Sequence, residues 1–132
     1  MTPHPRLKTP LCDLLGCEVP VMLAGMGGVS RWELAAAGGQ CGGHAPPWIV
    51  REGPTRPFAV NVIPSAPEPG LLDRQIGACL DLGVTDFSFF WDVVPEVIAR
   101  VIAQGARVIH QVGTVESARM AEDAGAAVLV AQ

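Results

Sequence analysis

The feature that most constrains the fold of this 132-residue chain is a pattern that occurs three times in its second half. Each copy consists of a helical stretch, a glycine, two further residues and a short strand. The three glycines are Gly83, Gly105 and Gly125. Strands that alternate with helices pair in parallel through right-handed crossovers, so the pattern predicts an α/β fold.

The spacing of apolar residues places the individual elements along the chain. The predicted helices cover residues 32–37, 72–80, 94–102 and 115–124, the last of them capped by Thr114. The predicted strands cover residues 19–24, 58–63, 86–91, 107–112 and 127–131. Strands as apolar as the last one are typical of a parallel sheet that is covered by helices.

The first predicted strand ends in a glycine-rich turn of Ala24, Gly25, Met26, Gly27 and Gly28. Backbone without side chains can approach a ligand closely at such a turn, and the free N–H groups of the following helix favour anions. A sharp strand-to-helix turn needs small residues for steric reasons as well. Taken alone, the turn therefore fits a structural role and a cofactor-binding role equally well.

Residues 38–57 interrupt the pattern, with five glycines and four prolines in twenty residues. A (β/α)8 barrel uses roughly 30 residues for each strand–helix unit, and the interval from Val19 to Phe58 has room for little more than one. We therefore predict one domain over residues 1–132. Its expected fold is a partial (β/α)8 TIM barrel that is incomplete around residues 38–57 and at the C-terminus.

Composition excludes several classes of protein. The net charge of −4 provides no basic surface for nucleic acid, and no apolar run approaches the roughly 20 residues of a membrane span. No hydrophobic signal segment follows Met1, so we expect a cytoplasmic protein. The cysteines lack CxxC spacing, which argues against a metal site. Cys12 and Cys17 are close enough in sequence to pair, but thiols are expected in a chain without a secretion signal.

Ligands of parallel α/β folds bind at the carboxyl ends of the strands, where this chain has several polar residues. Asn61 lies inside an apolar strand, where its amide needs either a neighbouring strand or a ligand as partner. Trp91 is expected in the core or in a wall, Asp92 as a helix cap, and His110 packed within its strand. No nucleophilic triad or carboxylate pair can be argued from spacing.

Several of these stretches together resemble the nitronate monooxygenases, the FMN-dependent TIM-barrel enzymes formerly called 2-nitropropane dioxygenases. The resemblance covers nearly the whole chain outside residues 38–57. Its most specific parts are Ala24-Gly25-Met26-Gly27-Gly28, Asn61-Val62-Ile63-Pro64 and Ser88-Phe89-Phe90-Trp91-Asp92. It extends to residues 10–16 and 110–113.

The resemblance implies an FMN site. The backbone of Ala24, Gly25, Met26 and Gly27 would lie against the flavin ring, and Asn61 would bond its polar edge. Gln132 matches a glutamine at the end of a later barrel strand that also contacts FMN. The implied substrates are an alkyl nitronate and O2, which react to give a carbonyl compound and nitrite, with the flavin carrying the redox chemistry.

The chain departs from this family in two places. Residues 38–57 stand where the family has its second strand and helix. The family also continues past the glutamine into Gly-x-Glu-Ala-Gly-Gly-His, whose histidine is the catalytic base. His44 copies Gly-Gly-His but comes too early in strand order. We therefore expect a chain truncated before the catalytic histidine, and assign no catalytic residue.

Two alternatives stay open at this stage. One is an FMN-dependent enoyl reductase, which shares the early glycine turn, although residues 88–95 favour the nitronate enzymes. The other is a non-catalytic barrel remnant. An unclosed parallel sheet leaves two edges with unpaired backbone groups, so we expect the isolated chain either to form a homo-oligomer through these edges or to be poorly soluble.

Overall fold

A computed structural model describes residues 8–22, 58–65, 68 and 70–132 of the chain. The chain divides into two compact units, Met1–Phe58 and Ala59–Gln132, and each is described by itself. The glycine turn, the predicted helix after it and residues 38–57 lie outside the described residues. The single-domain organisation therefore stays a prediction.

The first unit contains a short helix, α1 (Pro10–Leu15), which the apolar spacing did not predict. Thr9 is its N-cap in extended conformation, Pro10 occupies the first turn, and Gly16 ends the helix with a φ of 70°. Proline is favoured at a helix start and glycine just past its end, so these residues define both boundaries. Six residues are too few for helical periodicity to be recognised.

The predicted strand that begins at Val19 is wrong for its described part, because residues 19–22 are not in a strand. Pro20 has no N–H to donate to a ladder. The Val21 N–H bonds the Val19 carbonyl oxygen at 2.9 Å, a local contact that a paired strand would not make. Residues 23 and 24 lie outside the described part of the chain.

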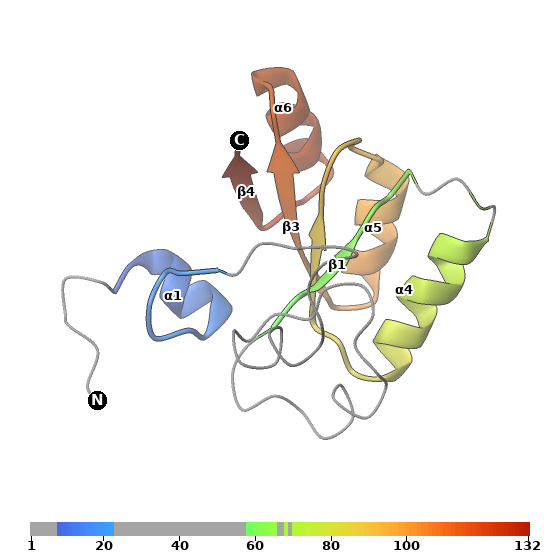
Figure 1. Cartoon of the computed structure of the whole chain (residues 1–132), viewed down its shortest axis with the longest axis horizontal. Coiled ribbons are helices and arrows are strands. Elements are labelled where there is room, and N and C mark those ends of the chain that lie inside the picture. The colour runs from blue at the N-terminus through green and yellow to red at the C-terminus, as the bar shows by residue number, and fades with distance from the viewer. Residues whose placement is uncertain (1–7, 23–57, 66–67, 69) are drawn as a thin grey trace, which may run out of the picture. The chain divides into compact units, whose positions relative to one another are not determined.

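The second unit is a four-stranded parallel sheet in the order β1-β2-β3-β4 with helices between the strands (Figure 1). Its elements in chain order are β1 (Val60–Val62), α4 (Leu71–Asp81), β2 (Asp86–Phe89), α5 (Pro95–Ala103), β3 (Arg107–Val112), α6 (Val115–Asp123) and β4 (Val128–Ala131). The predicted α/β class and its parallel strands are confirmed.

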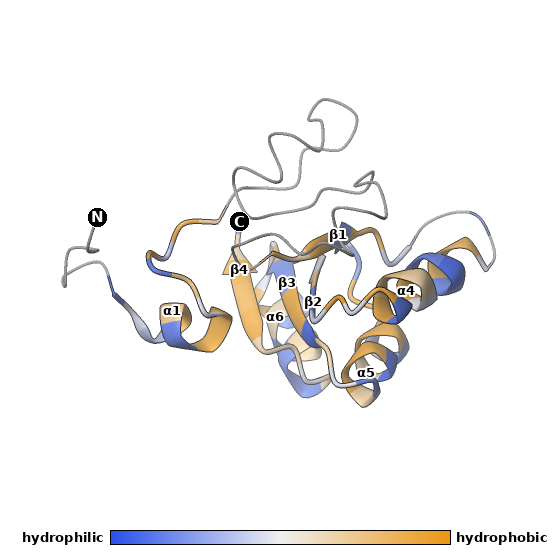
Figure 2. Ribbon diagram, turned by 90° about the horizontal axis from the view of Figure 1, so that it is seen from below, coloured by the Kyte–Doolittle hydropathy of each residue, from blue (hydrophilic) through white to orange (hydrophobic). Residues whose placement is uncertain are grey.

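The helices of the second unit cover a single face of the sheet, as Figure 2 shows. Helix α5 packs on β3, and α6 packs on β3 and β4. Right-handed crossovers place successive helices on the same face when the strand order never reverses, as in a barrel, whereas a doubly wound sheet has helices on both faces. The strand order therefore identifies a section of a barrel wall.

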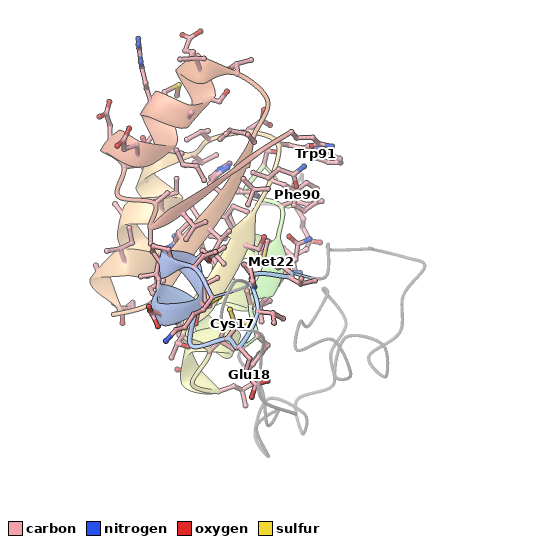
Figure 3. All side chains as sticks on the ribbon, turned by 90° about the vertical axis from the view of Figure 1, so that its left-hand side faces the viewer. Cys17, Glu18, Met22, Phe90 and Trp91 are labelled. Carbon is pink, nitrogen blue, oxygen red and sulfur yellow. The ribbon has the colours of Figure 1, made fainter. Side chains whose placement is uncertain are left out.

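Residues that pair in parallel register project from the same face of the sheet. On β1, β2 and β3 one set is buried and forms the core with α5: Val60, Val62, Phe87, Phe89, Val108 and His110. Its member on β4, Leu129, pairs with His110 and is 37% exposed. The alternate set contains Asn61, Ser88, Ile109 and Val128, followed by Gln111 and Val130. Phe90 lies on the side of the sheet opposite α5 and α6 (Figure 3), and we call this side the open face.

Strands β1 and β2 end before their apolar runs do. Strand β1 stops at Val62, two residues before Pro64, which has no backbone donor. Strand β2 stops at Phe89, and Trp91 has a φ of 70°, which ends the extended conformation. The bounds of β3 agree with the sequence, and α6 begins at the predicted cap, where Thr114 Oγ1 accepts the Ser117 N–H at 3.0 Å.

The amino-terminal edge of the sheet is held by an ion pair between neighbouring strands. Arg107 Nε donates to Asp86 Oδ1 at 2.7 Å, and a second guanidinium nitrogen donates to Oδ2 at 2.9 Å. The Thr85 hydroxyl also donates to Oδ2 at 2.8 Å. Two parallel bonds from one guanidinium fix both distance and angle, so the pair locks β2 against β3. The hydrogen bond to Asp86 raises the pKa of Arg107 above its ordinary value.

Within the described ranges, no helix has the length and apolarity needed to cross a bilayer. The same residues contain no cluster of histidine, cysteine or acidic side chains that could hold a metal ion.

Candidate functional site

The open face carries polar side chains on three of its four strands and just beyond the fourth. Asn61 of β1 and Ser88 of β2 are register partners, so they lie side by side in one row. Gln111 lies one step further toward the carboxyl edge, and Gln132 follows directly after β4. All four are neutral hydrogen-bonding groups. They form what we call the amide row: Asn61, Ser88, Gln111 and Gln132.

Gln111 and Gln132 are joined through their side chains, with Gln111 Nε2 donating to Gln132 Oε1. The backbone supports this contact, because the Gln132 N–H bonds the Val112 carbonyl oxygen at 3.0 Å and extends the β3–β4 ladder past Ala131. With its oxygen engaged by Gln111, the Gln132 amide is left to present its NH2 group. The pair therefore offers a donor at the carboxyl edge.

Asn61 is half-buried on β1, the strand at the far side of the sheet from Gln132. Within the described part of the chain, no hydrogen bond joins its amide to β2. The two predicted contacts thus share one face, but two strands, β2 and β3, lie between them. That separation suits a flat ligand lying across the sheet better than a small ion. Ala24, Gly25, Met26 and Gly27, the other predicted contacts, lie outside the described residues.

Trp91 is the one described non-glycine residue with a positive φ, 70°, and it is 70% exposed. The expectation of a core position is therefore wrong. Its ring meets Phe90 edge-on at a centroid distance of 5.0 Å, and both rings lie at the carboxyl end of β2 (Figure 3). A bulky residue in this backbone region is strained, and such strain concentrates at ligand sites. Trp91 supplies an exposed aromatic surface at the carboxyl end of β2, three residues after Ser88.

His110 is packed as predicted and does not belong to the amide row. Its ring is fully buried on the helix-covered face and meets Phe89 edge-on, with centroids 6.2 Å apart. Its Nδ1 lies 2.9 Å from the Gln111 carbonyl oxygen. A carbonyl oxygen can only accept, so Nδ1 carries the proton. His110 supports β3 from behind and is not placed to act on a ligand at the open face.

Asp92 is not the cap that the sequence suggested. Helix α5 begins at Pro95, its N-cap is Val94, and no side chain caps it. Pro95 has no N–H, so one of the donors that a capping side chain would serve does not exist. Asp92 is instead an exposed carboxylate two residues before the cap.

The amide row suits one kind of ligand chemistry. Amide and hydroxyl groups match the alternating carbonyl oxygens and ring nitrogens along the edge of a planar heterocycle, and Trp91 adds an apolar surface. A phosphate group would need cations or helix N-termini, and the amide row contains no charge. These residues therefore fit the polar edge of a flavin ring, the part that the resemblance assigns to Asn61, with Gln132 as a further FMN contact.

Sequence reasoning places Gln111 at a strand end, where ligands bind, but assigns it no contact, although a signal for one exists. Gln111 comes six residues after Gly105, and Gln132 comes seven residues after Gly125. Aligning the repeats on their glycines therefore places both glutamines near the ends of successive strands. The backbone conformation of Trp91 has no comparable signal in the sequence.

Comparison with known proteins supports this architecture. No protein-family model matches the chain. A Mycobacterium tuberculosis protein, (3aS,4S,5R,7aS)-5-hydroxy-7a-methyl-1-oxo-octahydro-1H-indene-4-carboxyl-CoA dehydrogenase, is 32% identical over 141 aligned positions, which cover 96% of this chain and 39% of that protein.

Two solved structures share the fold. FabK from Thermotoga maritima has a TM-score of 0.76 at 29% identity, over 94% of this chain and 43% of FabK. The nitroalkane oxidase from Streptomyces ansochromogenes has a TM-score of 0.66 at 30% identity, over 92% of this chain and 48% of that one. These neighbours are TIM-barrel flavoenzymes, so the described sheet has the fold of part of such a barrel. The chain spans less than half the length of each of these three proteins.

Proposed function

We propose that this chain forms the part of a flavin-dependent oxidoreductase barrel that holds the polar edge of the flavin ring. The observation that carries the proposal is the amide row, neutral groups on one face of a parallel sheet with the barrel strand order. Its likeness to flavoenzyme barrels at 29–30% identity supports the same assignment.

The residues of the row would bind and orient the ring in different ways. Asn61 can both donate and accept, so it can bond adjacent ring positions of opposite polarity. Gln132, oriented by Gln111, would donate to a ring oxygen or nitrogen. The flavin, when bound, supplies the electron transfer itself. Trp91 would exclude water from one side of the ring.

Within this class, we propose the nitronate monooxygenase reaction, the oxidation of an alkyl nitronate with O2, and FMN as the flavin. The motifs at residues 24–28, 61–64 and 88–92 support it, and so does the likeness to the nitroalkane oxidase. An enoyl reductase is the second candidate, favoured by the higher TM-score of FabK. Both use the ring edge in the same way, so the amide row does not distinguish them.

Ring binding is tested by titrating the chain with riboflavin, which has the flavin ring but no phosphate, and following flavin fluorescence. We expect saturable binding that Asn61→Leu and Gln132→Leu each weaken by about tenfold, the effect of one lost hydrogen bond of about 1.4 kcal/mol. Gln104→Leu is the matched control, because Gln104 is an exposed glutamine after α5, before the opposite end of β3. Equal affinity for all variants would refute the proposed ring contacts.

The two reactions are separated by the reductant that bleaches the bound flavin under anaerobic conditions. Bleaching by an alkyl nitronate and not by a reduced nicotinamide supports the nitronate reaction. The reverse result supports the enoyl reductase. Flavin binding without bleaching by either would leave the ring contacts standing and remove both reactions from this chain.

A further inference from the structure

Cys12 and Cys17 occupy two linked positions at the end of helix α1. Gly16 adopts the left-handed conformation, and the N–H groups of Gly16 and Cys17 both bond the Cys12 carbonyl oxygen, the latter at 3.0 Å. This is the helix-ending motif in which the chain turns back at the glycine. In that motif the side chain after the glycine contacts the side chain in the last helical turn, usually as a hydrophobic pair. Here both positions are cysteines.

The two sulfurs have different surroundings. Cys12 is 2% exposed, and its Sγ accepts the Thr9 N–H at 3.5 Å and lies 3.6 Å from the Thr9 hydroxyl. The bond from the Thr9 N–H lowers the pKa of Cys12, while burial raises the pKa of Cys17. Cys17 is half-buried, so the pair is open to solvent from its side (Figure 3). The arrangement favours a thiolate at Cys12 next to a thiol at Cys17.

We propose that Cys12 and Cys17 are a redox-modification site that closes to a reversible intramolecular disulfide in response to a peroxide. The backbone bond holds the two residues together, and a hydrogen bond between their thiols contributes to the pKa shift of each, so the two sulfurs are neighbours, as a disulfide requires. Both are thiols in the structure, which is therefore the reduced form. The proposal concerns only α1 and does not depend on the flavin site.

The reaction is balanced with hydrogen peroxide as the oxidant. The Cys12 thiolate attacks one peroxide oxygen, the O–O bond breaks, and the leaving hydroxide takes the Cys17 thiol proton to become water. Cys12 is then a sulfenic acid. The Cys17 thiolate attacks its sulfur, the S–O bond breaks, and the S–S bond forms as hydroxide leaves. This hydroxide takes from the solvent the proton that Cys12 released when it ionised, and becomes the second water. Two thiols are oxidised by two electrons, and one peroxide is reduced to two waters.

The disulfide can be detected by peptide mapping of the native chain after treatment with hydrogen peroxide and alkylation of the remaining thiols. Trypsin releases residues 9–31 as one peptide that contains both cysteines. We expect this peptide to lose the mass of two hydrogen atoms and to resist alkylation. Cleavage before Asp13 then leaves two pieces that stay joined until a reductant is added.

Matched variants and an unfolded control complete the test. Cys79→Ser removes a half-buried cysteine of α4 and should leave the joined product unchanged, while Cys17→Ser should abolish it and leave a sulfenic acid that dimedone traps at Cys12. Oxidation of the urea-unfolded chain should give mixed pairings that include Cys41 and Cys79. Mixed pairings in the native chain as well, or no loss of mass in the peptide, would overturn the proposal.

Discussion

Gln111 and Gln132 are 21 residues apart in the chain, yet Gln111 Nε2 donates a hydrogen bond to Gln132 Oε1 at the carboxyl edge of the sheet. Strands β3 and β4 bring them together through the pairing of Gln111 with Val130. Because an amide has one acceptor and two donors at opposite ends, engaging the oxygen of Gln132 determines which group faces a ligand. Gln111 is therefore a positioning residue for Gln132.

This relationship predicts a non-additive pair of substitutions. Gln111→Leu should weaken riboflavin binding by several-fold through the lost orientation of Gln132, and Gln132→Leu by about tenfold through the lost donor. The double variant should bind no more weakly than Gln132→Leu alone, because Gln111 can no longer orient an amide that has been removed. Fluorescence titration of the four chains measures the cycle. Strictly additive losses would show that Gln111 contacts the ligand independently.

The ion pair at the other edge of the sheet should carry stability. Asp86→Asn should lower the free energy of unfolding by about 2 kcal/mol, because the Asp86 carboxyl is nearly buried and Arg107 would lose its charged partner. Asp73→Asn is the control: its pair with Arg100 has the same 2.7 Å distance but is well exposed, and should cost under about 0.5 kcal/mol. Urea unfolding followed by circular dichroism measures both. Similar losses in the two variants would contradict this account.

The turn before β4 should be sensitive at Gly125. Gly125 has a φ of 97°, and a Cβ there would lie 2.9 Å from Ile102 Cδ1, whereas Gly83 has a φ of 80° with open space around it. Gly83→Ala should therefore cost about 1 kcal/mol of unfolding free energy for the left-handed backbone. Gly125→Ala should cost about 1–2 kcal/mol, because the end of the Ile102 side chain has to move and this small cost adds to the backbone term.

The clash at Gly125 can be separated from the backbone term. Ile102→Val removes the Cδ1 atom that the new Cβ would meet. In that background, the extra cost of Gly125→Ala should fall to that of Gly83→Ala. The same urea unfolding experiment decides it, and an unchanged extra cost would assign the whole effect to the backbone.

Cys12 of α1 and Cys17, which follows the helix, should differ in how the rate of their alkylation depends on pH. Alkylation follows the thiolate form, so Cys12 should reach its half-maximal rate below the ordinary pKa of cysteine and Cys17 above it. The lowered pKa of Cys12 adds to the free energy of unfolding, and this contribution is lost as the pH falls through the folded-state pKa of Cys12. The contribution from the raised pKa of Cys17 is lost as the pH rises through the folded-state pKa of Cys17. Iodoacetamide labelling between pH 6 and 10, resolved by peptide mapping, tests the order. A reversed order would contradict the contacts described for Thr9.

The edges of the sheet should govern the assembly of the isolated chain. Strands β1 and β4 each pair with one strand only within the described residues, so each leaves a row of backbone groups without a ladder. We expect size-exclusion chromatography to show a dimer or larger species. Ala131→Lys on β4 should reduce the share of the dimer or larger species. Ala103→Lys, the same change at an exposed residue of α5, should leave that share unchanged. A compact monomer of the unsubstituted chain would contradict the prediction.

Sequence reasoning correctly predicted the α/β class, the positions of the helices of the second unit and the bounds of β3. These depend on local physics: apolar spacing, a capping Thr114, and the glycine that ends each helix in a conformation other residues avoid. It failed at α1, which is too short for periodicity, and at residues 19–22, where an apolar run makes a local turn.

Which distant side chains meet depends on how the strands pair, and this could not be predicted from the sequence. Asp86 and Arg107, and likewise Gln111 and Gln132, are joined by strand order and register, which no local pattern specifies. A shift of one residue in register would turn every side chain of a strand to the other face, separating both pairs. The polar residues at the strand ends could thus be identified from the sequence, but only the paired strands of the sheet bring them together into one site.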